Sequence, residues 1–289
     1  IQVLNYFKLR SKKPVNLTPW KKITKIILHT KKHVNIAIIG KYVELKDAYK
    51  SLDEALTHGG IDNNVKINLV RIDSEKLKVS EIKSKLKNIS GILIPGGFGK
   101  RGTDGKIAAI KFARINKIPF LGICYGMQMA IIEFARNKLN LKKATSSEFD
   151  KKGLAIIGLM NEWNKDGKKI KGTDKNLGGT MRLGSYDAKL LKNSMIQKIY
   201  GKNLIKERHR HRYEVNIAFK EKFEKNGMNF SGLSPDGNLP EIIELKNHPW
   251  FIGVQFHPEF KSRPLQPHPL FSSFIGAAKK NNEKYYSKL

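Results

Sequence analysis

The chain contains one cysteine, Cys124, and its neighbours are those of a turn that presents a nucleophile. It lies between Gly122 and Gly126, after the apolar run 118–123 and before the segment 127–137, whose apolar residues recur at helical spacing. Small flanking residues permit the strained backbone of a strand–turn–helix elbow, and a helix N-terminus favours the thiolate. We therefore predict that Cys124 is a nucleophile; the alternative for a lone cysteine is a buried structural thiol.

A histidine and a carboxylate that could activate this thiol follow a second apolar run, 251–256. Residues two apart in an extended backbone point to the same side, so Glu259 can orient the imidazole of His257. The other ring nitrogen would then accept the proton of Cys124, as in a triad of nucleophile, base and orienter. Five other histidines have no such carboxylate and are expected to be ordinary surface or core residues: His29, His33, His58, His248 and His268.

A glycine-rich turn, PGGFG at 95–99, follows the short apolar run 91–94. Main-chain N–H groups without bulky side chains can approach a ligand closely, so the amides of Gly97 and Tyr125 could form an oxyanion hole. Gly97 precedes Cys124 by 27 residues, about the length of one helix and one strand. The two should therefore emerge at the same carboxyl edge of a parallel sheet.

Strand-like and helix-like segments alternate from about residue 34 onward. The expected strands are 35–39, 66–72, 91–94, 118–123, 155–159, 180–183 and 251–256, and the expected helices are 46–58, 75–87, 106–116, 127–137 and 269–280. This order predicts an α/β fold: a single domain with a largely parallel central sheet covered by helices on both faces. The polar, lysine-rich segment 161–176 is expected to be a surface loop.

The composition limits the classes of protein to which the chain can belong. The net charge is +30, but 45 of the 55 cations are lysines scattered along the chain, so we expect no specific nucleic-acid partner. One cysteine excludes an intrachain disulfide, and no apolar run approaches the roughly 18 residues needed to cross a membrane. These features are typical of a cytoplasmic enzyme.

The three motifs together resemble the class I (triad) glutamine amidotransferases. Three further stretches, KYVELKDAYKS at 41–51, GGTMRLG at 178–184 and RHRHRYEVN at 208–216, resemble the glutaminase half of the CTP synthase family. The resemblance runs from about residue 35 to 278. It implies that Cys124, His257 and Glu259 hydrolyse L-glutamine, and that the ammonia serves the ATP-dependent amination of UTP to CTP.

The resemblance also implies a set of glutamine-binding residues: Gly97, Tyr125, Gly126, Met127, Gln128, Glu148 and Arg212. A carboxylate and a guanidinium suit the ammonium and carboxylate groups of glutamine. Strand alternation would direct Arg208, Arg210 and Arg212 to one face and the two intervening histidines to the other. Tyr125 departs from the pattern, because a small or branched apolar residue is expected at this position.

The implied domains are a linker at 1–34 that follows a missing N-terminal synthetase domain, the glutaminase domain at 35–280, and a tail at 281–289. This domain would need no cofactor or metal, whereas ATP, UTP, Mg and activating GTP, and a homotetramer, belong to the full-length enzyme. No G-x-x-x-x-G-K-[ST] run is present, so the chain alone is not expected to make CTP. The alternatives are a stand-alone cysteine hydrolase of the gamma-glutamyl hydrolase or peptidase type, or an inactive regulatory module.

Overall fold

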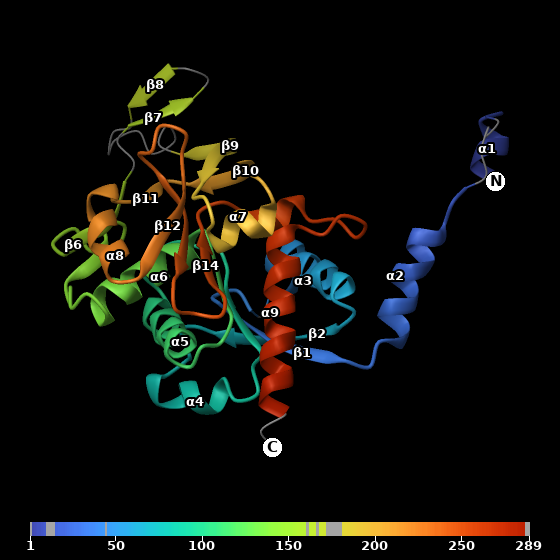
Figure 1. Cartoon of the computed structure of the whole chain (residues 1–289), viewed down its shortest axis with the longest axis horizontal. Helices are drawn as coiled ribbons and strands as arrows, with labels where there is room; N and C mark the ends of the chain where they lie inside the picture. Colours follow the sequence, from blue (N-terminus) through green and yellow to red (C-terminus); the bar gives the residue numbers. More distant parts are fainter. Residues whose placement is uncertain are drawn as a thin grey trace.

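A nine-stranded sheet forms the centre of the molecule (Figure 1). The computed structural model describes residues 2–9, 15–43, 45–159, 162–165, 168–171 and 181–286. Five strands form a parallel half, in the order β14 (Phe251–Val254), β4 (Phe120–Ile123), β3 (Gly91–Ile94), β1 (His33–Gly40) and β2 (Lys66–Asp73). Four strands extend the sheet beyond β14 in antiparallel pairing: β13 (Pro240–Leu245), β12 (Met228–Leu233), β9 (Arg182–Leu190) and β10 (Leu204–His211).

Helices cover both faces of this sheet, which confirms the predicted α/β class. One face packs against α3 (Lys50–Asp62), α7 (Met195–Tyr200) and α9 (Pro269–Tyr286). The other packs against α4 (Ile82–Lys85), α5 (Thr103–Ile115), α6 (Tyr125–Asn137) and α8 (Lys220–Lys225). Because side chains alternate along a strand, Ile36 and Ile38 of β1 enter the first layer, and Ala37 and Ile39 enter the second.

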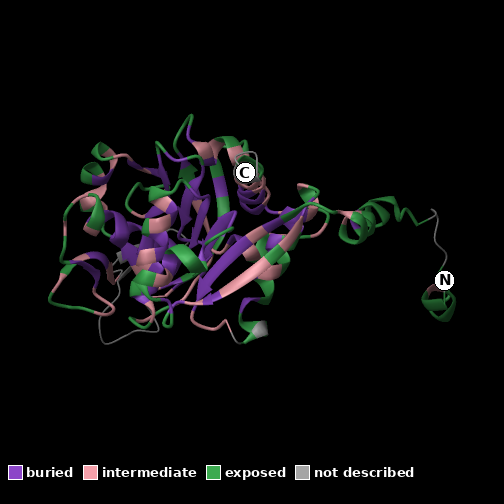
Figure 2. Cartoon of the chain, turned by 90° about the horizontal axis from the view of Figure 1, so that it is seen from below, coloured by how far each residue is buried: buried purple, intermediate pink, exposed green. Residues whose placement is uncertain are grey.

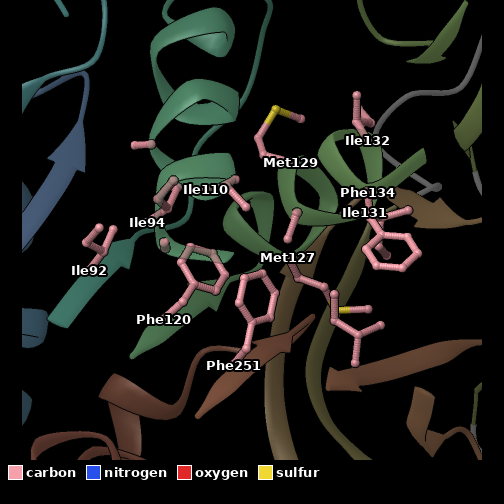
Figure 3. Packing of buried hydrophobic residues seen from close by; sticks show 14 of the residues in the cluster. Ile92, Ile94, Ile110, Phe120, Met127, Met129, Ile131, Ile132, Phe134 and Phe251 are labelled. Carbon is pink, nitrogen blue, oxygen red and sulfur yellow. The ribbon is translucent and has the colours of Figure 1, made fainter. Parts of the chain in front are cut away.

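Buried apolar residues pack beneath the turn that carries Cys124 (Figure 3). Met127 of α6 lies beside the ring of Phe251, which stacks on that of Phe120 with the centroids 4.4 Å apart across β4 and β14. Aromatic pairs of this kind add roughly 0.5–1.5 kcal/mol beyond the burial of their surface. The first turn of α6 is therefore held firmly against the parallel half of the sheet.

Two smaller sheets and four 3-10 turns also occur in the part of the chain that the structure describes. The first sheet joins β11 (Tyr213–Val215), β6 (Leu154–Leu159) and β5 (Ala144–Ser146), and the second is the hairpin of β7 (Glu162–Lys165) and β8 (Lys168–Lys171). The 3-10 turns are η1 (Lys46–Tyr49), η2 (Val79–Glu81), η3 (Ile217–Phe219) and η4 (Pro258–Lys261). The hairpin falls within 161–176, where a loop was expected, and the rest of that segment lies outside the described residues.

Other elements differ from the expected ones at particular points. The helix expected at 75–87 is reduced to η2 and α4, because Lys78 has an extended backbone (ψ 146°). The segment expected to be a linker contains α1 (Gln2–Tyr6) and α2 (Thr18–His29), which lead away from the body of the molecule (Figure 2). Helix α9 continues past 280 to Tyr286. Among the described helices, none is long and apolar enough to cross a membrane.

Candidate active site

Cys124 lies at the tight turn between β4 and α6, as the sequence predicts. Its backbone has φ 52° and ψ −101°, a conformation that side-chain-bearing residues rarely adopt. A Cβ atom on Gly126 would lie 2.1 Å from the carbonyl oxygen of Ile94, and one on Gly122 would lie 2.7 Å from the main chain of Gly126. The two glycines are therefore required for the turn to pack against β3 while it presents the thiol.

His257 and Glu259 form the expected pair at the end of β14. Nδ1 of His257 lies 2.7 Å from Oε1 of Glu259, and the other ring nitrogen, Nε2, is buried. Burial alone would lower the pKa of His257, but the negative charge and hydrogen bond of the Cys124 thiolate, together with Glu259, outweigh burial and raise this pKa to about 10. The ring also stacks on Phe260, with centroids 5.3 Å apart. The imidazole is thus held in one orientation and favours its protonated form.

The strand register brings the three motifs to one edge of the sheet. Residue 123 of β4 pairs with Val254 of β14, and Gly122 pairs with Ile94 of β3. The chain therefore leaves all three strands on the same side, at their carboxyl ends. A Cβ atom on Gly96 would lie 2.8 Å from Cε1 of His257, so the glycine turn and the histidine are in close contact. The expected meeting of the glycine turn, the cysteine and the histidine is confirmed.

The two main-chain amides that the sequence proposes as oxyanion donors, those of Tyr125 and Gly97, lie near each other. The N–H of Tyr125 is the first of α6 and has no acceptor within the helix. Gly97 is adjacent, because a Cβ atom built on it would lie 3.8 Å from Cδ1 of Tyr125. Among the described residues, neither amide has a hydrogen-bond acceptor. The role of these two amides as oxyanion donors stays a prediction.

Side chains hold the glycine turn, and the sequence indicated none of these contacts. The hydroxyl of Tyr125 donates to the carbonyl oxygen of Gly99 at 2.5 Å, and the N–H of Gly99 donates to Oε1 of Glu148 at 2.7 Å. Nζ of Lys41 donates to the carbonyl oxygen of Phe98. Burial raises the pKa of Glu148, against the opposing effects of the Gly99 hydrogen bond and Lys41.

Two glutamine side chains pack behind the nucleophile. Nε2 of Gln255 lies 3.7 Å from Sγ of Cys124, and its Oε1 accepts a hydrogen bond from Gln128 at 3.2 Å. Gln128 also donates to the carbonyl oxygen of Tyr213 at 2.8 Å. Gln255, which directly follows β14 and precedes His257 by two residues, was not among the predicted site residues. Together these contacts tie the first turn of α6 to the segment after β14 and to β11.

The RHRHR run forms the end of β10 and the bend after it. Arg208 and Arg210 are exposed, whereas His209 and His211 are buried, as strand alternation predicts. Arg212 lies past the strand and is half-buried. It directly precedes Tyr213, whose carbonyl oxygen accepts a hydrogen bond from Gln128 of α6.

The antiparallel half contains a buried charged cluster that the sequence did not indicate. Nη1 of Arg182 lies 2.6 Å from Oε1 of Glu241 and 3.4 Å from Oε1 of Glu214. His209 and His211 share a hydrogen bond of 3.0 Å and face these carboxylates. Burial raises the pKa of both glutamates despite the opposing effect of Arg182, and burial lowers the pKa of both histidines well below the usual range. The histidines are therefore neutral at pH 7.

Two other groups complete the site's surroundings. Lys106 is buried with Nζ 2.8 Å from Oγ of Ser74, and burial, helped by Lys41, lowers its pKa to about 8. His268 forms a buried pair with Glu207 at 3.0 Å, although no carboxylate adjoins it in the sequence.

Within the described ranges, no three His, Cys, Asp or Glu side chains gather into a group that could hold a metal ion.

Comparison with known proteins agrees with this geometry. The family described as glutamine amidotransferase class-I matches residues 44–277. A CTP synthase of Pelagibacter ubique is 88% identical over 279 residues, which cover 96% of this chain and 52% of that protein. A CTP synthase of Zymomonas mobilis is 55% identical over 283 residues, again 52% of its length. The chain thus spans about half the length of these curated relatives.

A solved structure covers nearly the same extent as the chain. It is described as the Trypanosoma brucei CTPS glutaminase domain with bound acivicin. It is 39% identical in sequence, has a TM-score of 0.77, and the match covers 86% of this chain and 94% of that one.

Proposed function

Because the chain belongs to the class I glutamine amidotransferases and matches the glutaminase half of CTP synthases, we propose that Cys124, His257 and Glu259 hydrolyse the side-chain amide of L-glutamine. One observation carries this assignment. His257 is bound to Glu259 through Nδ1, which leaves its buried Nε2 for Cys124, a neighbour that raises the pKa of this imidazole and lies in a strained turn. This arrangement supplies the nucleophile, the proton carrier and the orienting carboxylate of a covalent hydrolysis.

The reaction would proceed in two stages. The thiolate of Cys124 attacks the amide carbon, and the amides of Gly97 and Tyr125 bind the oxyanion of the tetrahedral intermediate. His257 gives its proton to the leaving nitrogen, so that ammonia departs and a thioester remains. Water then attacks the thioester while His257 accepts its proton, which releases glutamate and restores the thiolate and imidazolium.

The glutamine would lie along the first turn of α6, at Gly126, Met127 and Gln128. Glu148 is the proposed partner of the substrate ammonium, and Arg212 that of the carboxylate. Two observations support these roles. Glu148 already reaches the glycine turn through Gly99, and Arg212 adjoins Tyr213, which contacts Gln128. A bound ammonium would offset the burial that now raises the pKa of Glu148.

For the whole protein, we propose that the ammonia reaches an N-terminal synthetase half, which aminates UTP to CTP with ATP and Mg. Activation by GTP, a homotetrameric assembly and a cytoplasmic location belong to the same proposal. Support comes from the names of the curated relatives and from the half-length match. The division 1–34, 35–280 and 281–289 into linker, glutaminase domain and tail likewise remains a proposal.

The test uses a fusion protein in which this chain replaces the matching half of the Pelagibacter ubique CTP synthase. A glutamine-like electrophile, diazo-oxo-norleucine, should add its mass to the peptide that contains Cys124. The variant Cys124→Ala should lose glutamate release by at least about 1,000-fold. It should still make CTP from ammonium chloride, because only ammonia production needs the thiol. Labelling elsewhere, or glutamine-dependent CTP synthesis by the variant, would contradict the assignment.

A further inference from the structure

The glycine turn that carries one oxyanion donor has little structure of its own. Residues 95–102 form no helix or strand, and Gly99 and Gly102 have positive φ angles of 73° and 72°. Glycine-rich segments sample many backbone conformations. An oxyanion donor must nevertheless be held within about 0.5 Å of its productive position. The amide of Gly97 therefore depends on contacts that come from outside the turn.

Gly99, two residues after the donor, receives most of these contacts. Its carbonyl oxygen accepts from the hydroxyl of Tyr125 at 2.5 Å, and its N–H donates to Glu148 at 2.7 Å. Lys41 binds the carbonyl oxygen of Phe98. Of these three side chains, only that of Tyr125 comes from the turn that carries Cys124. It links the glycine turn directly to the nucleophile elbow.

The ring of Tyr125 is itself well fixed. Its side chain is 1% exposed, and it lies against the position of Gly97. Nζ of Lys41 lies 5.9 Å from the ring centroid and Nζ of Lys106 lies 5.7 Å from it, within the range of cation–π contacts. Burial and the charge of Glu148 raise the pKa of the hydroxyl, so it remains a protonated donor.

We propose that Tyr125 is a positioning residue that holds the two oxyanion donors in register. Its main-chain N–H is one donor, and its hydroxyl fixes the turn that presents the other, Gly97. The two donors are thus joined through a single residue. This inference rests on the proposed glutaminase function and adds a role for the Tyr125 side chain, where an apolar residue was expected.

The test removes only the hydroxyl. Tyr125→Phe in the fusion protein keeps the buried ring and both lysine contacts. Because oxyanion contacts strengthen in the transition state, kcat for glutamine hydrolysis should fall by about 10- to 100-fold, while KM stays within about twofold. Backbone hydrogen exchange of the peptide 95–102 should become faster, since the anchor at Gly99 is lost.

A matched control removes another hydrogen-bonded tyrosine hydroxyl. Tyr200 donates to Glu207 at 3.1 Å and has no hydrogen bond to the glycine turn. Tyr200→Phe should leave both kcat and the exchange of 95–102 at the wild-type values.

The outcomes separate this inference from the function on which it rests. Wild-type kcat and exchange in Tyr125→Phe would overturn the positioning role, and so would a rise in KM alone, which would assign the hydroxyl to substrate binding. If the wild-type fusion releases no glutamate, the proposed function is wrong. Exchange of 95–102 at the wild-type rate in Tyr125→Phe would then still overturn the anchor, and faster exchange would support it.

Discussion

The two halves of the central sheet position groups by different physical means. In the parallel half, strands β3, β4 and β14 are fully buried and uncharged, and they place the nucleophile turn through close main-chain contacts. In the antiparallel half, β9, β10 and β13 bury an arginine, glutamates and histidines that pair with one another. One half depends on the absence of side chains at particular glycines, and the other depends on balanced charge.

This contrast teaches where each kind of substitution should matter. A methyl group added at Gly122 or Gly126 of the parallel half meets backbone atoms of the adjoining segment. A charge removed from the antiparallel half leaves its partners buried without compensation. His257 lies where the two halves meet. It follows β14, and its main-chain N–H donates to the carbonyl oxygen of Arg208 on β10 at 2.8 Å.

The largest effect is expected from Gly126→Ala in the parallel half. The new Cβ atom would lie 2.1 Å from the carbonyl oxygen of Ile94, so α6 must shift away from β3. We expect the free energy of unfolding to fall by about 4 kcal/mol or more, and glutamine hydrolysis to fall by more than about 100-fold. Urea denaturation of the chain and glutamate release by the fusion protein measure the two effects.

Gly158→Ala is the matched control, because no atom lies within 4 Å of the Cβ position at this residue of β6. Its stability should stay within about 0.5 kcal/mol of the wild type. If the two alanine variants lost the same free energy of unfolding, close main-chain contact at Gly126 would not be what stabilises the parallel half.

A somewhat smaller effect is expected from Arg182→Met in the antiparallel half. Without the guanidinium, Glu214 and Glu241 lose the charge that opposes the burial-induced rise of their pKa values. We expect a loss of about 3–5 kcal/mol at neutral pH. A carboxyl whose folded-state pKa exceeds its ordinary value of 4.5 destabilises the fold as pH rises through that folded-state pKa.

The loss caused by Arg182→Met should therefore be larger at pH 8 than at pH 5, as measured by urea denaturation at both values. Arg263→Met, at an exposed surface position, serves as the comparison and should change stability little at either pH. A loss that does not depend on pH would mean that Arg182 stabilises by packing rather than by charge.

The smallest of the three effects is expected from Glu259→Gln, at the junction of the halves. The carboxylate helps to raise the pKa of His257 to about 10, so its neutral replacement should lower that pKa. We expect kcat to fall by about 10-fold and the alkaline limb of the rate profile, near pH 10 in the wild type, to move to lower pH. The rate of glutamate release from pH 6 to 11 measures both kcat and the position of the alkaline limb. If the limb of Glu259→Gln stayed at the wild-type pH, His257 would not be the group that controls it.

The same contrast explains which parts of the fold could be predicted from the sequence. The apolar runs of the parallel half gave β3 with its observed bounds and β1, β2, β4 and β14 to within a few residues. The buried side chains of β10 include Glu207, His209 and His211, so an apolar pattern does not mark this strand. Strand β13 likewise buries Glu241 and Glu244. In the sequence, charged residues that pair with one another inside the fold cannot be told from charged residues at the surface.

The candidate site divides in a similar way. Cys124, His257 and Glu259 could be predicted because each lies within a few residues of a motif with local geometry. The contacts of Gln255, Lys41 and Glu148 could not, because they join segments 49 to 131 residues apart in the chain. Spacing along the sequence carries no signal for such pairs, and only the register of the sheet brings them together.

The solitary thiol has a consequence for oxidative chemistry. Cys124 is the only cysteine of this chain and is 5% exposed. A sulfenic acid formed there could not condense with a second cysteine of the same chain, so its reduction would require a thiol from elsewhere before further oxidation makes the damage irreversible. The burial of Cys124 also limits the access of peroxide to it.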